Sequence, residues 1–279
     1  MKLMSFRRPD GQASWGVARA DGVVDCRGIA PSLRYGLAHM DRLREAAATP
    51  ATYGYDRIVY DPVVPDADKL LCVGLNYATH VAEGGREPPK QPMIFVRFNN
   101  SVVGHQRNLV RPRVSDKFDF EGELVVIIGK TCRHVAKADW QSVVAGYTCF
   151  NDGSIRDWQR HTSQFAPGKN FFHSGAFGPY MITPDEVGDI TQKELITRLN
   201  GEVMQHAPIS DLLFDIPTLI HYCSTFTQLE PGDAIVTGTT GGVGFARTPP
   251  VWMKPGDTIE IEVTGVGRLV NGIVDEGNG

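Results

Sequence analysis

Short apolar segments bounded by turn residues follow one another from Lys69 almost to the end of the chain, and this succession restricts the fold more than any other feature. Residues 70–74 and 93–96 have the length and composition of strands in a buried sheet. Asn200-Gly201 separates two strand-like arms, which is a strong signal for a β-hairpin. Residues 258–263 alternate polar and apolar side chains, as a half-buried strand does. The pattern predicts a mainly β, α+β fold.

One good helix is predicted within this β-rich part. Asp215 can cap it and Pro217 fits its first turn. Its apolar residues recur at helical spacing, namely Ile216, Leu219, Ile220, Cys223 and Phe226. We therefore expect this helix to pack on a sheet.

The first 66 residues differ from the rest of the chain. They combine short strand-like pieces with a predicted helix over residues 32–48. Pro62 and Pro65 then disfavour both helix and strand, which is typical of a boundary. We predict a small N-terminal module (residues 1–66) and a main domain (residues 67–279).

The composition argues against several classes of protein. The chain has 279 residues, and its net charge of -4 forms no block, so no nucleic-acid partner is expected. No apolar run approaches the roughly 18 residues that cross a bilayer, and the polar start lacks the apolar core of a secretory signal. Five scattered cysteines without a CxxC pair indicate neither a disulfide framework nor a zinc site. We expect a cytoplasmic protein without a membrane partner.

Two acids stand just before an apolar run in the stretch DFEGELVVIIGK, residues 119–130. In an extended chain Glu121 and Glu123 point to the same side, about 7 Å apart. Such carboxylates repel each other and lose hydration beside apolar residues. A divalent cation compensates for this, and oxygen ligands favour Mg²⁺, Mn²⁺ or Ca²⁺ over zinc. The alternative is an edge strand whose exposed charges oppose aggregation.

A second polar group follows in NDGSIRDWQ, residues 151–159. A turn of helix would direct Asp152, Arg156 and Gln159 toward one region. The competing interpretation is a simple Asp-Gly turn followed by a local ion pair between Arg156 and Asp157.

A histidine and a glutamate lie on a short predicted helix after the first strand of the main domain. His80 and Glu83 are three residues apart and share a face of this helix, which Asn76 is predicted to cap and Gly84-Gly85 to end. A carboxylate beside an imidazole orients the ring and raises its basicity, as a general base requires. Taken alone, such a histidine is more often a surface or packing residue.

The ordered set of motifs resembles the fumarylacetoacetate hydrolase family over about residues 69–275. Besides the two acidic stretches, it contains N-Y-x-x-H-x-x-E from Asn76 to Glu83, GKNF at residues 168–171 and TGTTGGVG at residues 237–244. The resemblance implies the mixed β-sandwich roll of that family, a bound Mg²⁺ or Mn²⁺ ion (or Ca²⁺ in a crystal) and a homodimer. It assigns the metal-ligand role to Glu121, Glu123 and Asp152.

The resemblance also implies roles for residues whose own context is uninformative. It makes His80 the general base, oriented by Glu83, and Lys169 a pocket cation that stabilises an enolate or a carboxylate. Substrate contacts are implied for Tyr77, Arg156, Gln159 and Thr239, the last through its hydroxyl and the neighbouring amides. Many family members have lysine where this chain has Arg97, which predicts altered selectivity at the distal end of the pocket. The resemblance implies that the segment carrying His80 and Glu83 acts as a lid, and the glycines and prolines of residues 84–89 suit its hinged loop.

The expected substrate is a 2-oxo acid. The favoured function is hydrolysis of a carbon-carbon bond in an acylpyruvate or related 2,4-dioxo acid, with water activated by His80 and a metal-stabilised enolate as the leaving group. Decarboxylation, tautomerisation or isomerisation of oxaloacetate-like or unsaturated 2-oxo diacids of aromatic catabolism uses the same enolate without attack by water, and stays open. A non-catalytic binder of 2-oxo acids is the remaining alternative, although such a protein is expected to lack the base.

Overall fold

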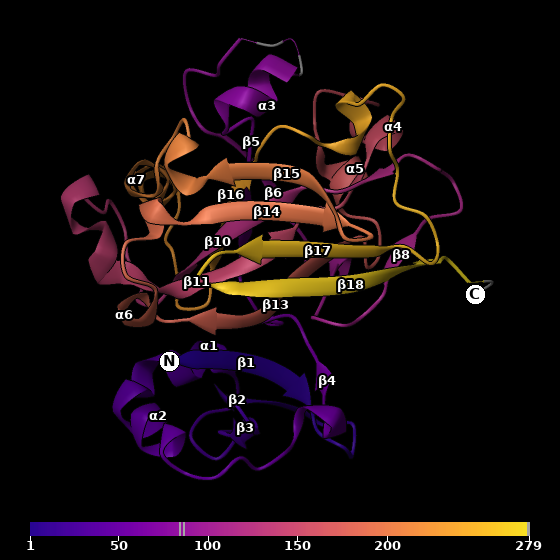
Figure 1. Ribbon diagram of the computed structural model, residues 1–279. Coiled ribbons are helices and arrows are strands. Elements are labelled where there is room, and N and C mark those ends of the chain that lie inside the picture. Colours follow the sequence, from indigo (N-terminus) through magenta and orange to yellow (C-terminus); the bar gives the residue numbers. More distant parts are fainter. Residues whose placement is uncertain (84, 86, 278–279) are drawn as a thin grey trace.

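The structure, a computed structural model, describes residues 1–83, 85 and 87–277, which form three β-sheets with short helices around them (Figure 1). The path of the largest sheet, in spatial order, is β3 (Gly22–Asp25), β2 (Ala13–Arg19), β1 (Lys2–Arg7), β13 (Gly175–Ile182), β11 (Val144–Asn151), β10 (Gly122–Ile128), β16 (Ala234–Thr239), β5 (Leu70–Gly74) and β6 (Met93–Arg97), with β4 (Val59–Tyr60) beside β1 and β7 (Val102–Val103) beside β13.

A five-stranded sheet lies in front of the large one in Figure 1. Its order is β15 (Glu202–Pro208), β14 (Glu194–Leu199), β17 (Thr258–Val263), β18 (Gly267–Asp275) and β8 (Leu109–Arg111). The third sheet is the pair β12 (Ser154–Ile155) and β9 (Phe118–Asp119). Two facing sheets with short helices around them confirm the predicted mainly β, α+β fold.

The helices of the described residues are short. The α-helices are α1 (Leu33–Gly36), α2 (Met40–Ala47), α3 (Ala78–Glu83), α4 (Arg156–Gln159), α5 (Ala166–Lys169), α6 (Pro184–Val187) and α7 (Ile216–Phe226). The 3₁₀-helices are η1 (Leu37–His39), η2 (Tyr55–Arg57), η3 (Asn99–Ser101), η4 (Lys137–Val143), η5 (Ile190–Gln192), η6 (Ile209–Asp211) and η7 (Gly244–Ala246). Within the part of the chain that the structure describes, none of them has the length and hydrophobicity to cross a membrane.

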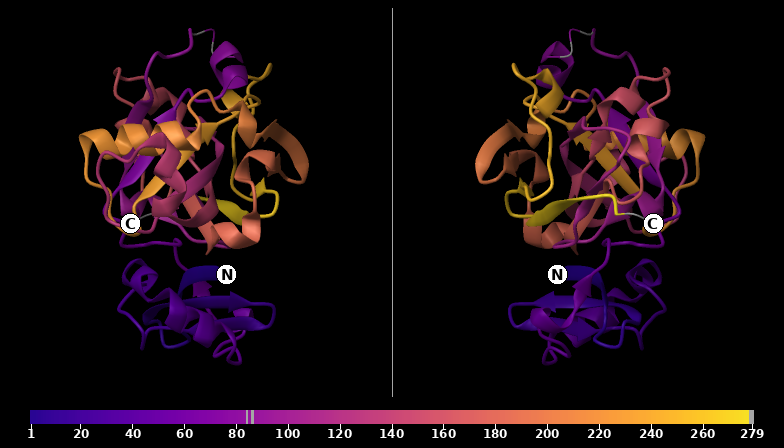
Figure 2. Two further views of the ribbon diagram at one scale, coloured as in Figure 1. Left: turned by 90° about the vertical axis from the view of Figure 1, so that its left-hand side faces the viewer. Right: turned by 90° about the vertical axis from the view of Figure 1, so that its right-hand side faces the viewer.

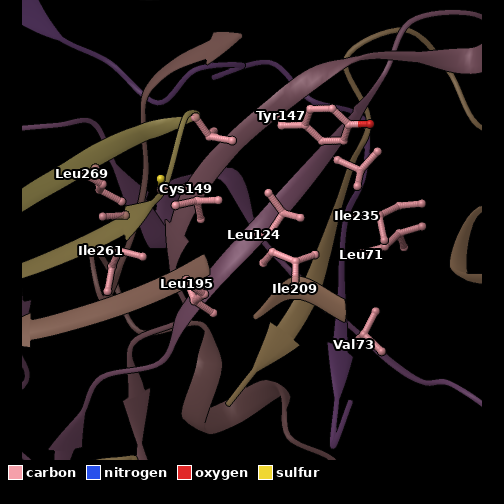
Figure 3. Close-up of a cluster of buried hydrophobic side chains, with 14 of the residues drawn as sticks. Leu71, Val73, Leu124, Tyr147, Cys149, Leu195, Ile209, Ile235, Ile261 and Leu269 are labelled. Atoms are coloured by element: carbon pink, nitrogen blue, oxygen red, sulfur yellow. The ribbon is translucent and has the colours of Figure 1, made fainter. Parts of the chain in front are cut away.

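Strand β10 is central to the large sheet, and its side chains divide between two hydrophobic cores. Leu124, Val126 and Ile128 lie in the core between the two sheets, which Figure 3 shows with residues of the five-stranded sheet such as Leu195 and Ile261. The intervening Val125 and Ile127 lie in a second core on the opposite face. This division follows from the period of two in a strand. All seven residues of β10 are buried, so the alternative of an exposed edge strand is wrong.

The N-terminal module continues the large sheet. Strand β1 pairs with β13 through Lys2↔Ile182 and Leu3↔Met181, and the module lies at one end of the molecule in all three ribbon views (Figures 1 and 2). The second core contains Trp15 and Leu33 from the module and Val125 from the main domain. The helix predicted over residues 32–48 is broken into α1, η1 and α2. The boundary near residue 66 stays a prediction, because the two parts share a core.

Local signals in the sequence gave several correct elements. The hairpin at Asn200-Gly201 joins β14 to β15, with φ of 53° and 83°, the left-handed conformation that Asn and Gly tolerate in such turns. Asp215 caps α7 by accepting a hydrogen bond from the Thr218 N–H, and Pro217 lies in the first turn. The expected helix face is right except at its end, because Phe226 is 54% exposed.

The two ends of this helix face allow a test of packing. Leu219 is fully buried, so Leu219→Ala should lower the free energy of unfolding by about 2–5 kcal/mol. Phe226→Ala on the same helix is the matched control and should change it by no more than about 0.5 kcal/mol, as for other exposed positions. Denaturant titration followed by circular dichroism measures both. A similar loss in the two variants would mean that Phe226 is covered in solution.

Candidate active site

Antiparallel pairing of β10 with β11 brings the predicted metal ligands together. Gly122 at the start of β10 is opposite Asn151 at the end of β11, and the Asp152 N–H donates to the Glu121 carbonyl (2.8 Å). Glu121 therefore precedes the strand instead of lying within it, and Asp152 directly follows the neighbouring strand. Carboxylate oxygens of Glu121, Glu123 and Asp152 lie within 4.8 Å of one another, and all three residues are buried. Strand register thus gathers acids that are 31 residues apart at most.

Two cations neutralise part of this acidic cluster. Lys169, at the end of α5, places its Nζ 2.6 Å from Glu121 Oε2 and 2.6 Å from Asp152 Oδ2. Arg156 Nη1 lies 2.6 Å from Glu121 Oε1. Burial alone would raise the pKa of the Glu121 carboxyl, but the charges of Arg156 and Lys169 lower it to about 2. Burial opposes the charge of Lys169, and the two acids nevertheless raise its pKa, so this side chain stays a cation.

Glu123 is in a different position from the other two acids. Its Oε2 accepts a hydrogen bond from the Gly238 N–H (2.5 Å), and none of the ion pairs among the described residues involves it. Burial, followed by the charges of Asp152 and Glu121, raises its pKa well above the usual range. A divalent ion would remove this deficit of positive charge, and three carboxylates are ligands of the kind that Mg²⁺ or Mn²⁺ prefers. The residues therefore fit such an ion.

Arg97 lies behind the acids and does not shape the distal end of the cavity, contrary to the prediction. Its side chain is buried, and its Nη1 donates to Asp152 Oδ1 (2.6 Å) and to the Gly153 carbonyl (3.0 Å). The remaining guanidinium nitrogens donate to Ser101 and Ser174. A planar fork with five N–H groups can make all these contacts at once, whereas an ammonium group cannot. Arg97 thus holds one oxygen of Asp152 and leaves the other toward Lys169 and the acids.

Loss of this contact should weaken metal binding. Arg97→Met removes the guanidinium and leaves Asp152 Oδ1 without its charged partner, so we expect the affinity for Mn²⁺ to fall about 10- to 100-fold. Arg97→Lys retains the charge, so its affinity for Mn²⁺ should lie between that of Arg97→Met and that of the natural protein. Isothermal titration with Mn²⁺ measures the affinities, and Arg198→Met, at a partly exposed ion pair on β14, is the control. An unchanged affinity in a folded Arg97→Met variant would contradict this role.

The acids open into a cavity of about 100 Å³ beneath α3. Its walls contain His80, Glu121, Glu123, Lys169, Arg156, Gln159 and Thr239, together with Phe95, Phe165 and Phe245. Most of the residues predicted to act on a substrate therefore face one space. Its volume lies below the roughly 300–1,000 Å³ of sites for drug-sized ligands, which indicates a compact ligand.

His80 and Glu83 share a face of α3, as predicted. His80 Nδ1 lies 3.6 Å from Glu83 Oε2, and both oxygens of Glu83 accept from the Gly242 N–H (3.0 and 3.2 Å). The buried Nδ1 has no hydrogen-bond partner among the described residues. A separation of 3.6 Å is longer than a hydrogen bond, and catalytic pairs commonly tighten when a substrate binds. Asn76 does not cap this helix, because its side chain bonds Phe214 and Thr237 instead.

Part of the predicted lid lies outside the described residues. The two residues of this part are Gly84 and Arg86. The hinged loop over residues 84–89 therefore stays a prediction.

Arg156 is anchored from behind by an acid other than its sequence neighbour. Its Nε donates to Asp119 Oδ2 (2.7 Å) and its Nη1 to Gln159 Oε1 (2.9 Å), so the proposed pair with Asp157 does not form. The buried Nη2 has no partner among the described residues. Arg156 is also one of the residues that line the cavity.

Two predicted substrate contacts are placed differently. Tyr77 is fully buried in the core between the sheets and is absent from the cavity wall; Leu75, the residue after β5, has a left-handed backbone (φ 56°). Thr239 lines the cavity, but its hydroxyl donates to the Gly122 carbonyl (2.9 Å) and accepts from Gln205 Nε2 (2.8 Å). Its hydroxyl proton is therefore already engaged.

A family profile described as fumarylacetoacetate hydrolase, C-terminal, matches residues 69–274. The chain belongs to the fumarylacetoacetate hydrolase family. Oxaloacetate tautomerase FAHD2A, a mitochondrial protein of Bos taurus, is 37% identical over 98% of this chain and 92% of its own length. A putative HpcE protein of Mycobacterium smegmatis has a crystal structure that superposes with a TM-score of 0.88 at 32% identity, covering 99% of this chain and 100% of the other.

One related structure also contains ligands. Maleylpyruvate hydrolase of Sphingobium sp. SYK-6, in complex with manganese(II) and pyruvate, superposes with a TM-score of 0.82 at 28% identity over 99% of this chain and 100% of that one. Members of the fumarylacetoacetate hydrolase family with similar folds thus include a tautomerase and a hydrolase by name. These names support an enzyme function for this chain, but they do not select one of the two reactions.

Two residues that position side chains of the site in this fumarylacetoacetate hydrolase family member were not predicted from the sequence. Asp119 is fully buried, binds Arg156 and accepts from the Gly244 and Phe245 N–H groups (2.8 and 3.1 Å). Its signal was its position two residues before Glu121, which continues the alternation of acids. Gln205 fixes Thr239 from β15, and a lone glutamine on a distant strand gives no such signal.

The glycine-rich segment TGTTGGVG has a different role from the one expected. Its amides at Gly238, Gly242 and Gly244 bind the protein's own carboxylates, Glu123, Glu83 and Asp119 respectively. The loop therefore positions acids around the cavity, and these three amides are not free for a substrate carboxylate.

Proposed function

We propose that this protein is a Mg²⁺- or Mn²⁺-dependent enzyme that interconverts the keto and enol forms of a small 2-oxo acid by moving a proton. The observation that carries the proposal is the shared cavity, in which a histidine and a buried lysine flank the three acids. The tautomerase name of a relative that matches nearly the whole chain supports the same reaction.

The residues of the site divide the reaction between them. Glu121, Glu123 and Asp152 would hold the ion, which supplies Lewis-acid polarisation of the 2-oxo group. Glu83 beside Nδ1 of His80 orients the imidazole, and the ring moves a proton to or from the carbon next to the 2-oxo group. Lys169 balances the negative charge of the enolate oxygen, and Arg156, which lines the cavity, donates to the acid's carboxylate. In ketonisation the enol O–H bond breaks and the C–H bond forms, so no water is consumed and no carbon-carbon bond breaks.

Hydrolysis of a carbon-carbon bond in an acylpyruvate, which the sequence favours, is the second candidate. It is supported by the His80 and Glu83 pair, since activation of water needs an oriented base, and by the hydrolase name of a structural neighbour. The cavity of about 100 Å³ favours proton transfer, because hydrolysis must also accommodate an attacking water beside the substrate.

A direct assay separates these reactions. Protein stripped with EDTA and reloaded with Mg²⁺ or Mn²⁺ is tested for ketonisation of enol-oxaloacetate by ultraviolet absorbance, for release of pyruvate from acetylpyruvate, and for decarboxylation of oxaloacetate. We expect metal-dependent ketonisation to be the fastest. Faster hydrolysis would favour the second candidate, and tight binding of pyruvate without any turnover would favour a binder.

The homodimer and the cytoplasmic location stay predictions. Light scattering of the purified protein should give twice the monomer mass of 30.6 kDa if the first is right.

A further inference from the structure

Arg160 differs from the other cations in and behind the cavity. Arg97, Arg156 and Lys169 each lie 2.6–2.7 Å from a buried carboxylate. Arg160 also lines the cavity, but it is exposed, and none of the ion pairs among the described residues involves it. Its guanidinium is therefore a cation at the mouth of the site that no acid of the described residues neutralises.

The backbone fixes where this side chain begins. Arg160 directly follows α4, and its N–H donates to the Asp157 carbonyl (3.1 Å). Its guanidinium carbon lies 4.9 Å from the centroid of the Phe245 ring, and that of Arg156 lies 4.5 Å from the same centroid. The His80 ring is 6.4 Å from Phe245 as well. Phe245 thus joins the inner cation, the base and the outer cation along one wall of the cavity.

This wall has the order of groups that a diacid requires. The 2-oxo-acid end of a substrate belongs at Glu121, Glu123 and Lys169, and the carbon that exchanges a proton belongs near His80. A chain that continues along Phe245 then ends beside Arg160. An arginine that is not already paired binds a carboxylate through charge-assisted, often bidentate, hydrogen bonds.

We propose that Arg160 binds the second carboxylate of a dicarboxylic 2-oxo acid, so that this site selects diacids over monocarboxylic acylpyruvates. The inference rests on the proposed function, because it takes the 2-oxo acid end of the ligand as given. It makes Arg160 the residue that determines specificity at the outer end of the cavity, the role that Arg97 had in the sequence-based prediction.

Binding and turnover of a matched pair of acids test this assignment. Manganese-loaded protein is titrated with pyruvate, a monoacid, and kcat/KM is measured for enol-oxaloacetate, a diacid. Arg160→Gln should lower kcat/KM for enol-oxaloacetate about 10- to 100-fold, mainly through KM, and change the Kd of pyruvate by less than about twofold. Arg160→Lys should recover part of the loss. Arg44→Gln, on exposed helix α2 of the N-terminal module, should change neither value.

The outcomes separate this inference from the proposed function. Equal losses for the monoacid and the diacid in Arg160→Gln, or no loss for either, would overturn the assignment of Arg160 while the enzyme remains a 2-oxo-acid enzyme. Failure of the natural protein to bind pyruvate and to convert oxaloacetate would overturn the proposed function itself.

Discussion

Glu123→Gln should lower metal-dependent turnover of a 2-oxo acid by about 10³-fold or more. The change keeps the volume of the side chain and an oxygen that can accept from the Gly238 N–H, but it removes a charged oxygen from the cluster of three acids. Asp152→Ala should have the same effect on turnover. Steady-state assays with saturating Mn²⁺ measure the loss.

A stability measurement separates loss of the ion from loss of the fold. In EDTA, Glu123→Gln should melt close to the natural protein, because burial and the neighbouring acids already disfavour the ionised form of Glu123. Excess Mn²⁺ should raise the melting temperature of the natural protein, as any ligand of the folded state does, and should have little effect on the variant. Glu262→Gln, at a partly exposed ion pair on β17, is the control. An equal Mn²⁺-induced rise in both proteins would exclude Glu123 as a ligand.

His80→Ala should reduce turnover about 10²- to 10⁴-fold and leave the affinity for Mn²⁺ unchanged, because the imidazole lines the cavity and is not among the three clustered acids. Glu83→Gln should have a smaller effect, since it alters the orientation of the base and not the base itself. Assays of turnover and calorimetric titration with Mn²⁺ on the same preparations give the two quantities.

A second histidine-glutamate pair provides the matched control. His206 Nε2 lies 3.1 Å from Glu194 Oε2, and both side chains are about half exposed on the five-stranded sheet, so His206→Ala removes a similar pair that does not line the cavity. It should leave turnover unchanged. Turnover by His80→Ala equal to that of the natural protein would remove the histidine from both candidate mechanisms.

Local chemistry explains which parts of the fold were predictable. The hairpin at Asn200-Gly201 and the cap at Asp215 depend on residues close in sequence, so the pattern gave both. The pairing of β1 with β13 joins residues about 180 positions apart in the sequence. Neither strand contains a sequence signal that identifies the strand it pairs with. The exposure of Phe226 at the end of α7 was not predicted either. Helical spacing shows which residues share a face, but it does not show how far along the helix that face is covered by other residues.

The site shows the same division. Glu121 and Glu123 are separated by one residue, so the geometry of an extended chain alone predicted that they point to the same side. Asp152 was placed beside them by a family resemblance, whereas the pairing of β10 with β11 is the physical cause. The position of Arg97 behind Asp152 could not be predicted, because Arg97 ends β6 and Asp152 follows β11, two strands that are not paired with each other. The role of Asp119 is consistent with its position, because it continues the alternation of acids at residues 121 and 123.

The continuous sheet has a practical consequence for anyone producing this protein. The family profile begins at residue 69, so a truncated protein that starts at this residue would be an obvious choice for expression. Such a fragment would lose Leu3, Trp15 and Leu33, and would turn the apolar underside of β10 and β11, including Val125 and Phe150, toward solvent. Surfaces of that kind drive precipitation. Residues of the predicted N-terminal module thus cover this face, and we expect a fragment that begins at residue 69 to precipitate more readily than the full chain.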